Sequence, residues 1–206
     1  MDKARVEAFS DGVFAIVITL LIFDIKAPEL ISATNADLWV ALVRLIPSIV
    51  MYFVTFTVVS VLWINHHFLF HSFAKTVDRQ LNLLNMSYLM FGAFLPFSAN
   101  ILGLHHTLQP AALLYGINIC IISLLSVAMV RYVLAHSEIL NHSLSRRIVK
   151  QSRIRTSVSA VFAIAGLLTT FLWTPLAIFL YAFPVIFNII PGTLDLTEKI
   201  FGFTLE

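Results

Sequence analysis

The strongest constraint on the fold of this chain is an apolar run near its N-terminus that contains a carboxylate. From Gly12 to Phe23, Thr19 is the only polar residue. Counted from Arg5, the run is long enough to cross a bilayer as a helix, which needs about 20 residues at about 1.5 Å each. An aspartate at the centre of such a helix costs about 2.5–3.5 kcal/mol. Asp11, in its first half, must therefore be paired or face protein or water, which predicts a functional or assembly helix rather than a plain anchor.

Apolar residues dominate the whole chain. Hydrophobic residues make up 59% of the 206 positions and charged residues only 12%, which predicts an all-α integral membrane protein. The apolar runs predict a single domain, residues 1–206, with six transmembrane helices at about 4–25, 38–69, 79–104, 109–135, 154–173 and 175–191. The last two come from one run that is too long for a single crossing. Trp173-Thr174-Pro175 predicts the break, and one helix kinked at Pro175 and Pro184 is the alternative.

Basic residues are unevenly divided between the two sides of the predicted bundle. If the N-terminus is cytoplasmic, nearly all of them lie on that side, while Lys26 lies in an outer loop and Arg44 within the second helix. This distribution follows the positive-inside rule and places both termini in the cytoplasm. The formal net charge of +2 gives no reason to expect a nucleic-acid partner. The single cysteine, Cys120, excludes an intrachain disulfide.

The first helix has two unlike faces when its residues are placed about 100° apart. One face is smooth and almost uncharged, and holds the residues within about 60° of Ile16, which are Gly12, Thr19, Leu20 and Phe23. Ser10 and Asp11 lie on the opposite side, at about 120° and 140° from Ile16. That polar pair needs hydrogen-bond partners from neighbouring helices.

Polar residues near the cytoplasmic ends of the second and third helices are the candidate partners of Asp11. Imidazole and amide groups can donate hydrogen bonds to a buried carboxylate. The candidates are Asn65, His66 and His67 on the second helix and Asn82 and Asn85 on the third. His66 and His67 are about 100° apart on a helix, so at most one of them is expected to point at Asp11.

The same histidines could instead belong to a metal enzyme. His66, His67 and His71 form an HHxxxH cluster, and imidazole suits iron and zinc. Membrane di-iron enzymes need many more histidines on one side of the membrane, and no run of acidic ligands accompanies these. The sequence also contains no nucleotide-binding fingerprint and no convincing catalytic triad. We therefore predict no metal site, no cofactor and no enzymatic activity.

Asp24 is predicted at the outer end of the first helix, where two interpretations remain open. Several copies of it around a pore would form an acidic ring that concentrates cations. Alternatively, it is an interfacial carboxylate that meets Arg44 or Lys26.

Three motifs resemble the transmembrane protein 175 family, whose members are potassium-permeable channels without the usual selectivity-filter loop. Arg5-x-x-x-Phe9-Ser10-Asp11 before an apolar helix resembles the family signature. Trp63-x-Asn65-His66-His67-x-x-Phe70 and Leu95-Pro96-Phe97 are similar to family patterns in the second and third helices. The resemblance covers about the first half of the chain. After Gly103 only the hydropathy profile agrees.

The resemblance implies a potassium-selective or potassium-preferring channel, in which four copies of the chain surround a pore lined by the first helix. The pore residues would be Ile16, Thr19, Leu20 and Phe23. Ile16 would form a hydrophobic constriction and Thr19 would favour potassium over sodium, with the permeant ion near these two residues. Asp24 would lie at the outer mouth. The other copies of the chain and membrane lipids would be the partners, in the plasma membrane of a prokaryote.

The resemblance also implies a structural network between the signature and the next two helices. Its expected members are Arg5, Phe9, Ser10, Asp11, Trp63, Asn65, His66, His67 and Asn85. A proton-conducting channel or a cation/proton transporter is the alternative function, because Asp11 and the histidines of the second helix could also relay protons.

Overall fold

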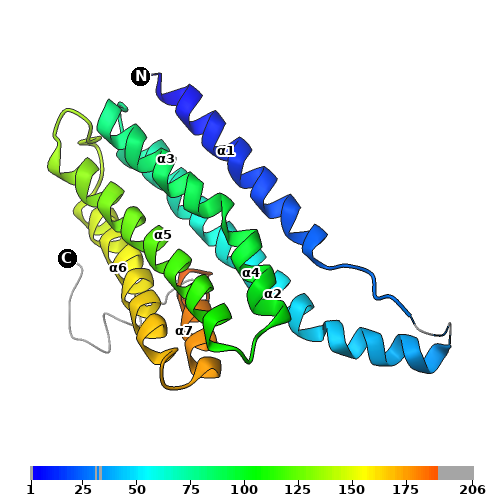
Figure 1. Ribbon diagram of the computed structural model, residues 1–206. Coiled ribbons are helices and arrows are strands. Elements are labelled where there is room, and N and C mark those ends of the chain that lie inside the picture. The colour runs from blue at the N-terminus through cyan, green and yellow to red at the C-terminus, as the bar shows by residue number, and fades with distance from the viewer. Residues whose placement is uncertain (1, 31, 33, 190–206) are drawn as a thin grey trace.

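The computed structural model describes residues 2–30, 32 and 34–189. Over these residues the chain is a bundle of helices, as expected (Figure 1). α1 (Lys3–Leu20) continues as the 3₁₀ turn η1 (Leu21–Asp24), and α2 (Asn35–Phe68) ends in the π-turn η2 (Leu69–Phe73). The remaining helices are α3 (Arg79–Ala93), α4 (Leu95–Leu104), α5 (Gln109–Ala135), α6 (Arg146–Thr169) and α7 (Thr174–Ile189).

Four helical segments of the described chain are long and apolar enough to cross a membrane. They are Lys3–Asp24, Asn35–Phe73, Arg79–Leu104 and Gln109–Ala135. A shorter apolar helix covers Thr174–Val185, and α6 carries basic residues in its first turns. The chain is thus a multi-pass membrane protein, and the number of six crossings stays a prediction.

Capping side chains account for where several helices begin. Thr34 accepts a hydrogen bond from the backbone N–H of Asp37, so α2 begins before residue 38. Ser145 accepts one from Ile148, so α6 begins well before residue 154. The predicted helix over 79–104 is divided at Phe94, because Pro96 has no N–H and restricts the residue before it. The run over 154–191 is divided between Thr169 and Thr174.

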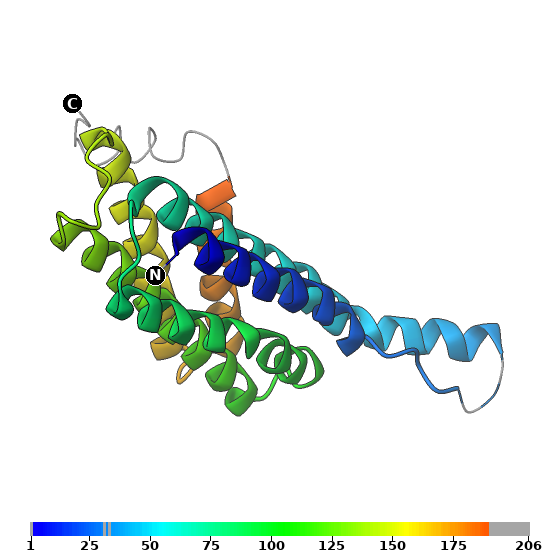
Figure 2. The same cartoon turned by 90° about the horizontal axis from the view of Figure 1, so that it is seen from above.

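The helices divide into two groups that pack side by side. α1 lies against α2, α3 and α4, while α5, α6 and α7 form the other side of the bundle (Figures 1 and 2). The first turns of α2 extend beyond the bundle in both views. Their large apolar side chains, such as Trp39 and Val43, are exposed. In a membrane protein such a surface is covered by lipid or by another subunit.

Two glycines allow α5, α6 and α7 to approach one another around Tyr181. A Cβ atom at Gly116 would lie 1.9 Å from the Tyr181 hydroxyl, and one at Gly166 would lie 2.5 Å from its Cε1 atom. The Tyr181 hydroxyl is 2.9 Å from the hydroxyl of Thr170. The buried tyrosine thus fills the space that two missing side chains leave.

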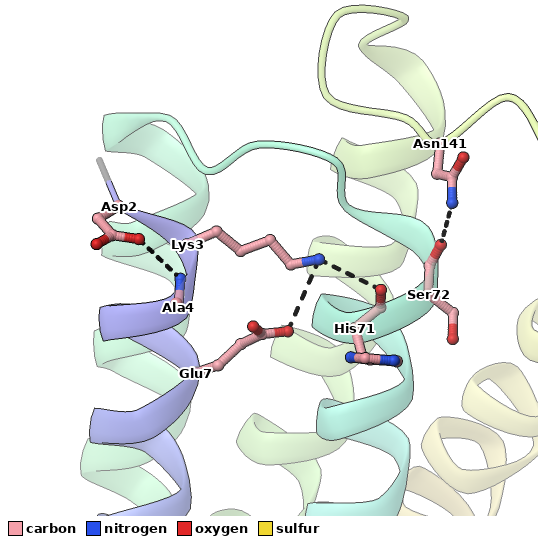
Figure 3. A network of polar contacts seen from close by, with 7 residues as sticks. All are labelled: Asp2, Lys3, Ala4, Glu7, His71, Ser72 and Asn141. Carbon is pink, nitrogen blue, oxygen red and sulfur yellow. Dashed lines mark hydrogen bonds and ion pairs between the residues drawn. The ribbon is translucent and has the colours of Figure 1, made fainter.

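Loops at the end of the bundle that holds the N-terminus are tied together. Asn141 donates to the carbonyl of Ser72 at 3.1 Å, and Lys3 donates to the carbonyl of His71 at 3.2 Å (Figure 3). Lys3 also lies 3.8 Å from the carboxylate of Glu7, one turn along α1. These contacts connect the start of α1 and the loop after α5 to the end of α2.

Asp78, which caps α3, belongs to the same end of the molecule. Partial burial alone would raise the pKa of its carboxyl group. The hydroxyl of Tyr132 and the backbone N–H of Leu81 donate to it, and His136 lies nearby. These groups favour the charged form, so the pKa of Asp78 is lowered from its ordinary value.

Candidate functional site

One face of α1 is buried in its own subunit and the other is exposed. The buried residues of α1 and η1 recur every three or four positions, as expected for one stripe of a helix: Val6, Ser10, Phe14, Val17 and Leu21. On the opposite side Ile16 is 59% exposed and Phe23 is 74% exposed, and Gly12, Thr19 and Leu20 are exposed as well. Ile18 is partly buried and packs against the core. The smooth stripe predicted from the sequence therefore faces away from the rest of its subunit.

Thr19 is the only hydroxyl on this exposed stripe. Its Oγ1 lies 2.9 Å from the carbonyl oxygens of both Ala15 and Ile16. A hydroxyl has one hydrogen and two lone pairs, and the hydrogen is used here within the helix. The lone pairs of Thr19 thus remain available on the exposed side of α1.

A buried chain of hydrogen bonds joins α1 to α3 and α2. The hydroxyl of Ser10 donates to the carbonyl of Val6 at 2.8 Å and accepts from the amide of Asn85 at 3.1 Å. The Oδ1 atom of Asn85 is 2.7 Å from Nε2 of His66. Ser10 and Asn85 are fully buried and His66 is almost so. In a dry interior these bonds hold the three helices in one relative position.

The partner of Asp11 differs from the one that the sequence suggested. The indole N–H of Trp63 donates to Oδ1 of Asp11 at 2.8 Å, and neither histidine does. His66 is held by Asn85 and stacks on Phe70 with ring centroids 4.5 Å apart. His67 stacks on Trp63 instead, at 5.7 Å. An indole offers one N–H donor on a rigid ring, so it serves the carboxylate as well as an imidazole does.

Three residues of the expected network lie outside it. Arg5 and Phe9 line an open groove between α1 and α3 together with Asn82 and Met86. Within the described residues, the side chains of Arg5 and Asn65 have no hydrogen-bond partner or ion pair. Asn65 lines cavities between α2 and α6, on the side of α2 away from Asp11. The polar contacts of α1 thus form two groups, a chain of Ser10, Asn85 and His66, and a pair of Asp11 and Trp63 on which His67 packs.

Asp24 has a partner that the sequence analysis missed. The amide of Asn100 on α4 donates to Oδ1 of Asp24 at 2.7 Å, so neither Arg44 nor Lys26 is the partner. A single asparagine inside the apolar run 95–104 was the signal that could have identified it. The contact orients the carboxylate at the end of η1.

The described part of the chain contains no cluster of side chains that could bind a metal ion. Over residues 2–30, 32 and 34–189 there is no group of three or more His, Cys, Asp or Glu side chains that could hold a metal ion. His67 and His71 stack on each other with ring centroids 5.3 Å apart.

Comparisons with known proteins agree with the resemblance. Residues 5–96 match the family described as "Endosomal/lysosomal potassium channel TMEM175". A potassium channel of Chryseobacterium sp. (strain P1-3) is 31% identical over 191 residues, which cover 93% of this chain and 94% of that relative. The similarity therefore extends well beyond Gly103, where the sequence analysis found agreement only in hydropathy. The human endosomal/lysosomal proton channel TMEM175 is 40% identical over 104 residues, or 48% of this chain and 20% of that protein.

A solved structure extends the likeness to the fold. The crystal structure of a lysosomal potassium-selective channel TMEM175 homolog from Chamaesiphon minutus superimposes with a TM-score of 0.78 at 27% identity. The match covers 91% of this chain and 96% of that one. These relatives are ion channels and not enzymes. From the near full-length similarity to the Chryseobacterium channel and the match over residues 5–96, this chain belongs to the TMEM175 family of ion channels.

Proposed function

We propose that the protein is a potassium-preferring cation channel formed by four copies of the chain, with α1 of each copy at the central axis. The observation that carries this proposal is the exposed stripe of α1. Ser10 fixes α1 with this stripe outward, and the stripe carries the hydroxyl oxygen of Thr19, whose lone pairs would have no partner in lipid. A central pore gives that stripe a partner, because four copies would face one another across it.

Ile16 forms the constriction in this arrangement. It lies in the second half of α1, on the stripe that has no ionisable group between Gly12 and Phe23. A ring of branched aliphatic side chains excludes water and hydrated ions by narrowness and dewetting. Small rotations of α1 would widen or close such a ring.

Thr19 supplies the oxygen atoms next to that constriction. Because its hydroxyl hydrogen is donated within the helix, its lone pairs are turned toward the pore and can replace part of the hydration shell of a cation. No carbonyl filter is required for this contact. Leu20 and Phe23 line the pore beyond Thr19, and Asp24, oriented by Asn100, gives the outer mouth negative charge.

Ion flux into liposomes that contain the purified protein tests the proposal. Potassium, sodium and proton gradients are imposed separately, and the mass of the assembly is measured in parallel by native mass spectrometry. We expect a tetramer, potassium flux above sodium flux, and proton flux far below both. Equal flux of the two alkali cations would contradict the preference, and a stable monomer would contradict the assembly.

Proton conduction is the second candidate function. It is favoured by one observation, namely that the vertebrate relatives are described as proton channels and match 48% of this chain. Asp11 and His66 would be the side chains along such a path. Proton flux that persists without a permeant alkali cation, and that disappears in Asp11→Asn at equal yield of tetramer, would select this function instead.

A further inference from the structure

A cavity between α2 and α6 plays no part in the proposed pore. It lies at the end of the bundle where α6 begins and α2 approaches η2, the same end as the N-terminus (Figure 1). Its lining contains both polar and apolar side chains. The polar residues are Asn65 on α2 and Gln151, Ser152, Arg155 and Thr156 on α6. The apolar residues are Ile64, Phe68 and Ile148.

Thr156 uses its hydroxyl hydrogen within α6, but the other four polar side chains have hydrogen-bonding capacity that nothing in the described chain uses. The Nε atom of Arg155 is buried and has no hydrogen-bond partner. The side chains of Asn65, Gln151 and Ser152 also make no hydrogen bond within the described residues. A buried donor without a partner costs about 1–3 kcal/mol, and more when it is charged. Such a convergence of unused donors indicates a missing acceptor.

Charge identifies the acceptor as an anion. Arg155 carries a permanent positive charge, and its planar guanidinium group suits phosphate oxygens. None of the described residues that line the cavity carries a carboxylate. Amide and hydroxyl groups from Gln151 and Ser152 would complete the coordination of phosphate oxygens.

The apolar residues of the lining identify the anion as part of a lipid. Ile64, Phe68 and Ile148 would have no use for a free, fully hydrated phosphate, but they match the glycerol backbone and the first methylene groups of a phospholipid. Asn65 and Thr156 also line a second cavity deeper in the bundle, which is bounded mainly by apolar residues such as Leu62, Ile122 and Val185. The two cavities thus share Asn65 and Thr156 as lining residues.

We propose that this cavity binds the phosphate group of an anionic phospholipid, with Arg155 as its main ligand and the apolar side chains against the start of an acyl chain. By the positive-inside rule the basic beginning of α6 faces the cytoplasm, so the lipid belongs to the inner leaflet. The inference does not rest on the proposed channel function, because lipid binding and ion flux are measured separately.

Native mass spectrometry of the full-length protein in detergent tests the site, with phosphatidylglycerol and phosphatidylcholine of equal chain length as the lipids. We expect phosphatidylglycerol to bind more tightly, and Arg155→Gln to weaken this binding about tenfold, as expected for the loss of a charge-assisted hydrogen bond. The matched control is Arg153→Gln, which removes an equal charge from an exposed position two residues away. It should change the binding less than twofold.

A second variant and a second ligand complete the design. Gln151→Leu keeps the charge of the site and removes a donor, so we expect about threefold weaker binding even if Arg155→Gln does not fold. Equal binding of phosphatidylglycerol by Arg155→Gln and Arg153→Gln, or by Gln151→Leu and the parent, would overturn the proposal. Inorganic phosphate is titrated alone against the thermal stability of the protein. Stabilisation by phosphate equal to that by the lipid would show a free-anion site and overturn the assignment to a lipid.

Discussion

At the scale of single residues, the polar groups of α1 are distinguished by how their hydrogen bonds are used. Ser10 has both of its partners inside the subunit, and Asp11 is held by one indole. Thr19 directs its hydrogen into its own helix and leaves its lone pairs outside. Only Thr19 thus offers oxygen lone pairs on the exposed stripe, which is why the proposed ion contact falls there.

Replacing Ile16 by Asn tests the constriction. In the proposed tetramer, four amide side chains would replace four aliphatic ones at the constriction. Water should then enter the constriction more easily. We expect the resting cation leak to rise on the order of tenfold, equal to about 1.4 kcal/mol off the barrier, and the preference for potassium to fall. The measurement is liposome flux at equal yield of tetramer. Ile18→Val is the control and should conduct like the parent, because Ile18 is partly buried against the core. If Ile16→Asn also conducts like the parent, this face of α1 does not line the pore.

Replacing Trp63 by Phe tests the contact with Asp11. Phenylalanine keeps an aromatic ring against His67 but has no N–H to donate. Both partners are partly exposed, so we expect a loss near the lower end of the range for hydrogen bonds, about 1 kcal/mol. A double-mutant cycle with Asp11→Ala, followed by thermal unfolding of the assembly, measures the coupling. A coupling energy of zero would mean that the indole does not stabilise this carboxylate.

At the scale of elements, the α5, α6 and α7 side of the molecule depends on close approach, and the α1, α2 and α3 side depends on hydrogen bonds. Tyr181 needs the space at Gly116 and Gly166, whereas Ser10, Asn85 and His66 connect their helices by polar contacts. An added side chain at a glycine would disrupt the close approach of α5, α6 and α7. Loss of a hydrogen-bond donor would weaken the contacts among α1, α2 and α3.

Replacing Gly166 by Ala tests the close approach. The added Cβ would lie 2.5 Å from Cε1 of Tyr181 and 3.3 Å from the carbonyl oxygen of Ala177, so α7 must shift. We expect a loss of about 1–3 kcal/mol of stability, measured by thermal unfolding in detergent. Gly92→Ala is the matched control, since no heavy atom lies within 4 Å of its added Cβ. Because alanine has a higher helix propensity than glycine, the stability of Gly92→Ala should be unchanged or greater by up to about 1 kcal/mol. Equal losses in the two variants would disprove the role of Tyr181.

Asp78 gives the start of α3 a dependence on pH. Its folded pKa is below its ordinary value of 3.8, so the charged carboxylate stabilises the fold above that value. This contribution is lost as the pH falls through the folded pKa. We expect Asp78→Asn to unfold at a lower temperature than the parent at about pH 7, and the difference to shrink toward about pH 3. Melting curves across this range measure it, and a difference that does not change with pH would exclude the charge as the cause.

At the scale of the whole molecule, exposed apolar surface is the dominant feature. It covers the outward stripe of α1 and the first turns of α2, which extend beyond the bundle (Figure 2). Lipid can cover most of it. The stripe of α1, with a polar oxygen at Thr19, matches a water-filled axis between subunits better than the interior of a bilayer.

The orientation of the chain in the membrane can be tested at its C-terminus. From six predicted crossings and the distribution of basic residues we expect Glu206 on the cytoplasmic side with Lys3. We expect a protease site added after Glu206 to be cleaved in inside-out vesicles and protected in intact cells. Cleavage from outside intact cells would contradict the prediction of a sixth crossing.

The sequence by itself determined the properties that depend on one segment at a time. Hydropathy placed the chain in a membrane, and the helical period separated the stripe of Ile16 from Ser10, because both follow from residue type and a rotation of about 100° per residue. Three short motifs, around Asp11, Trp63 and Pro96, indicated the family for the same reason, since the residues of each are close together in the chain.

Only the tertiary structure decided which side chains meet. That Trp63 rather than a histidine donates to Asp11, that Asn100 holds Asp24, and that Asn65 faces α6 all depend on how each helix is rotated and shifted against its neighbours. A shift of one residue turns a helix by about 100° and moves it by about 1.5 Å, enough to exchange one partner for another. Local periodicity contains no information about that register, because it is set by the packing of side chains from several helices at once.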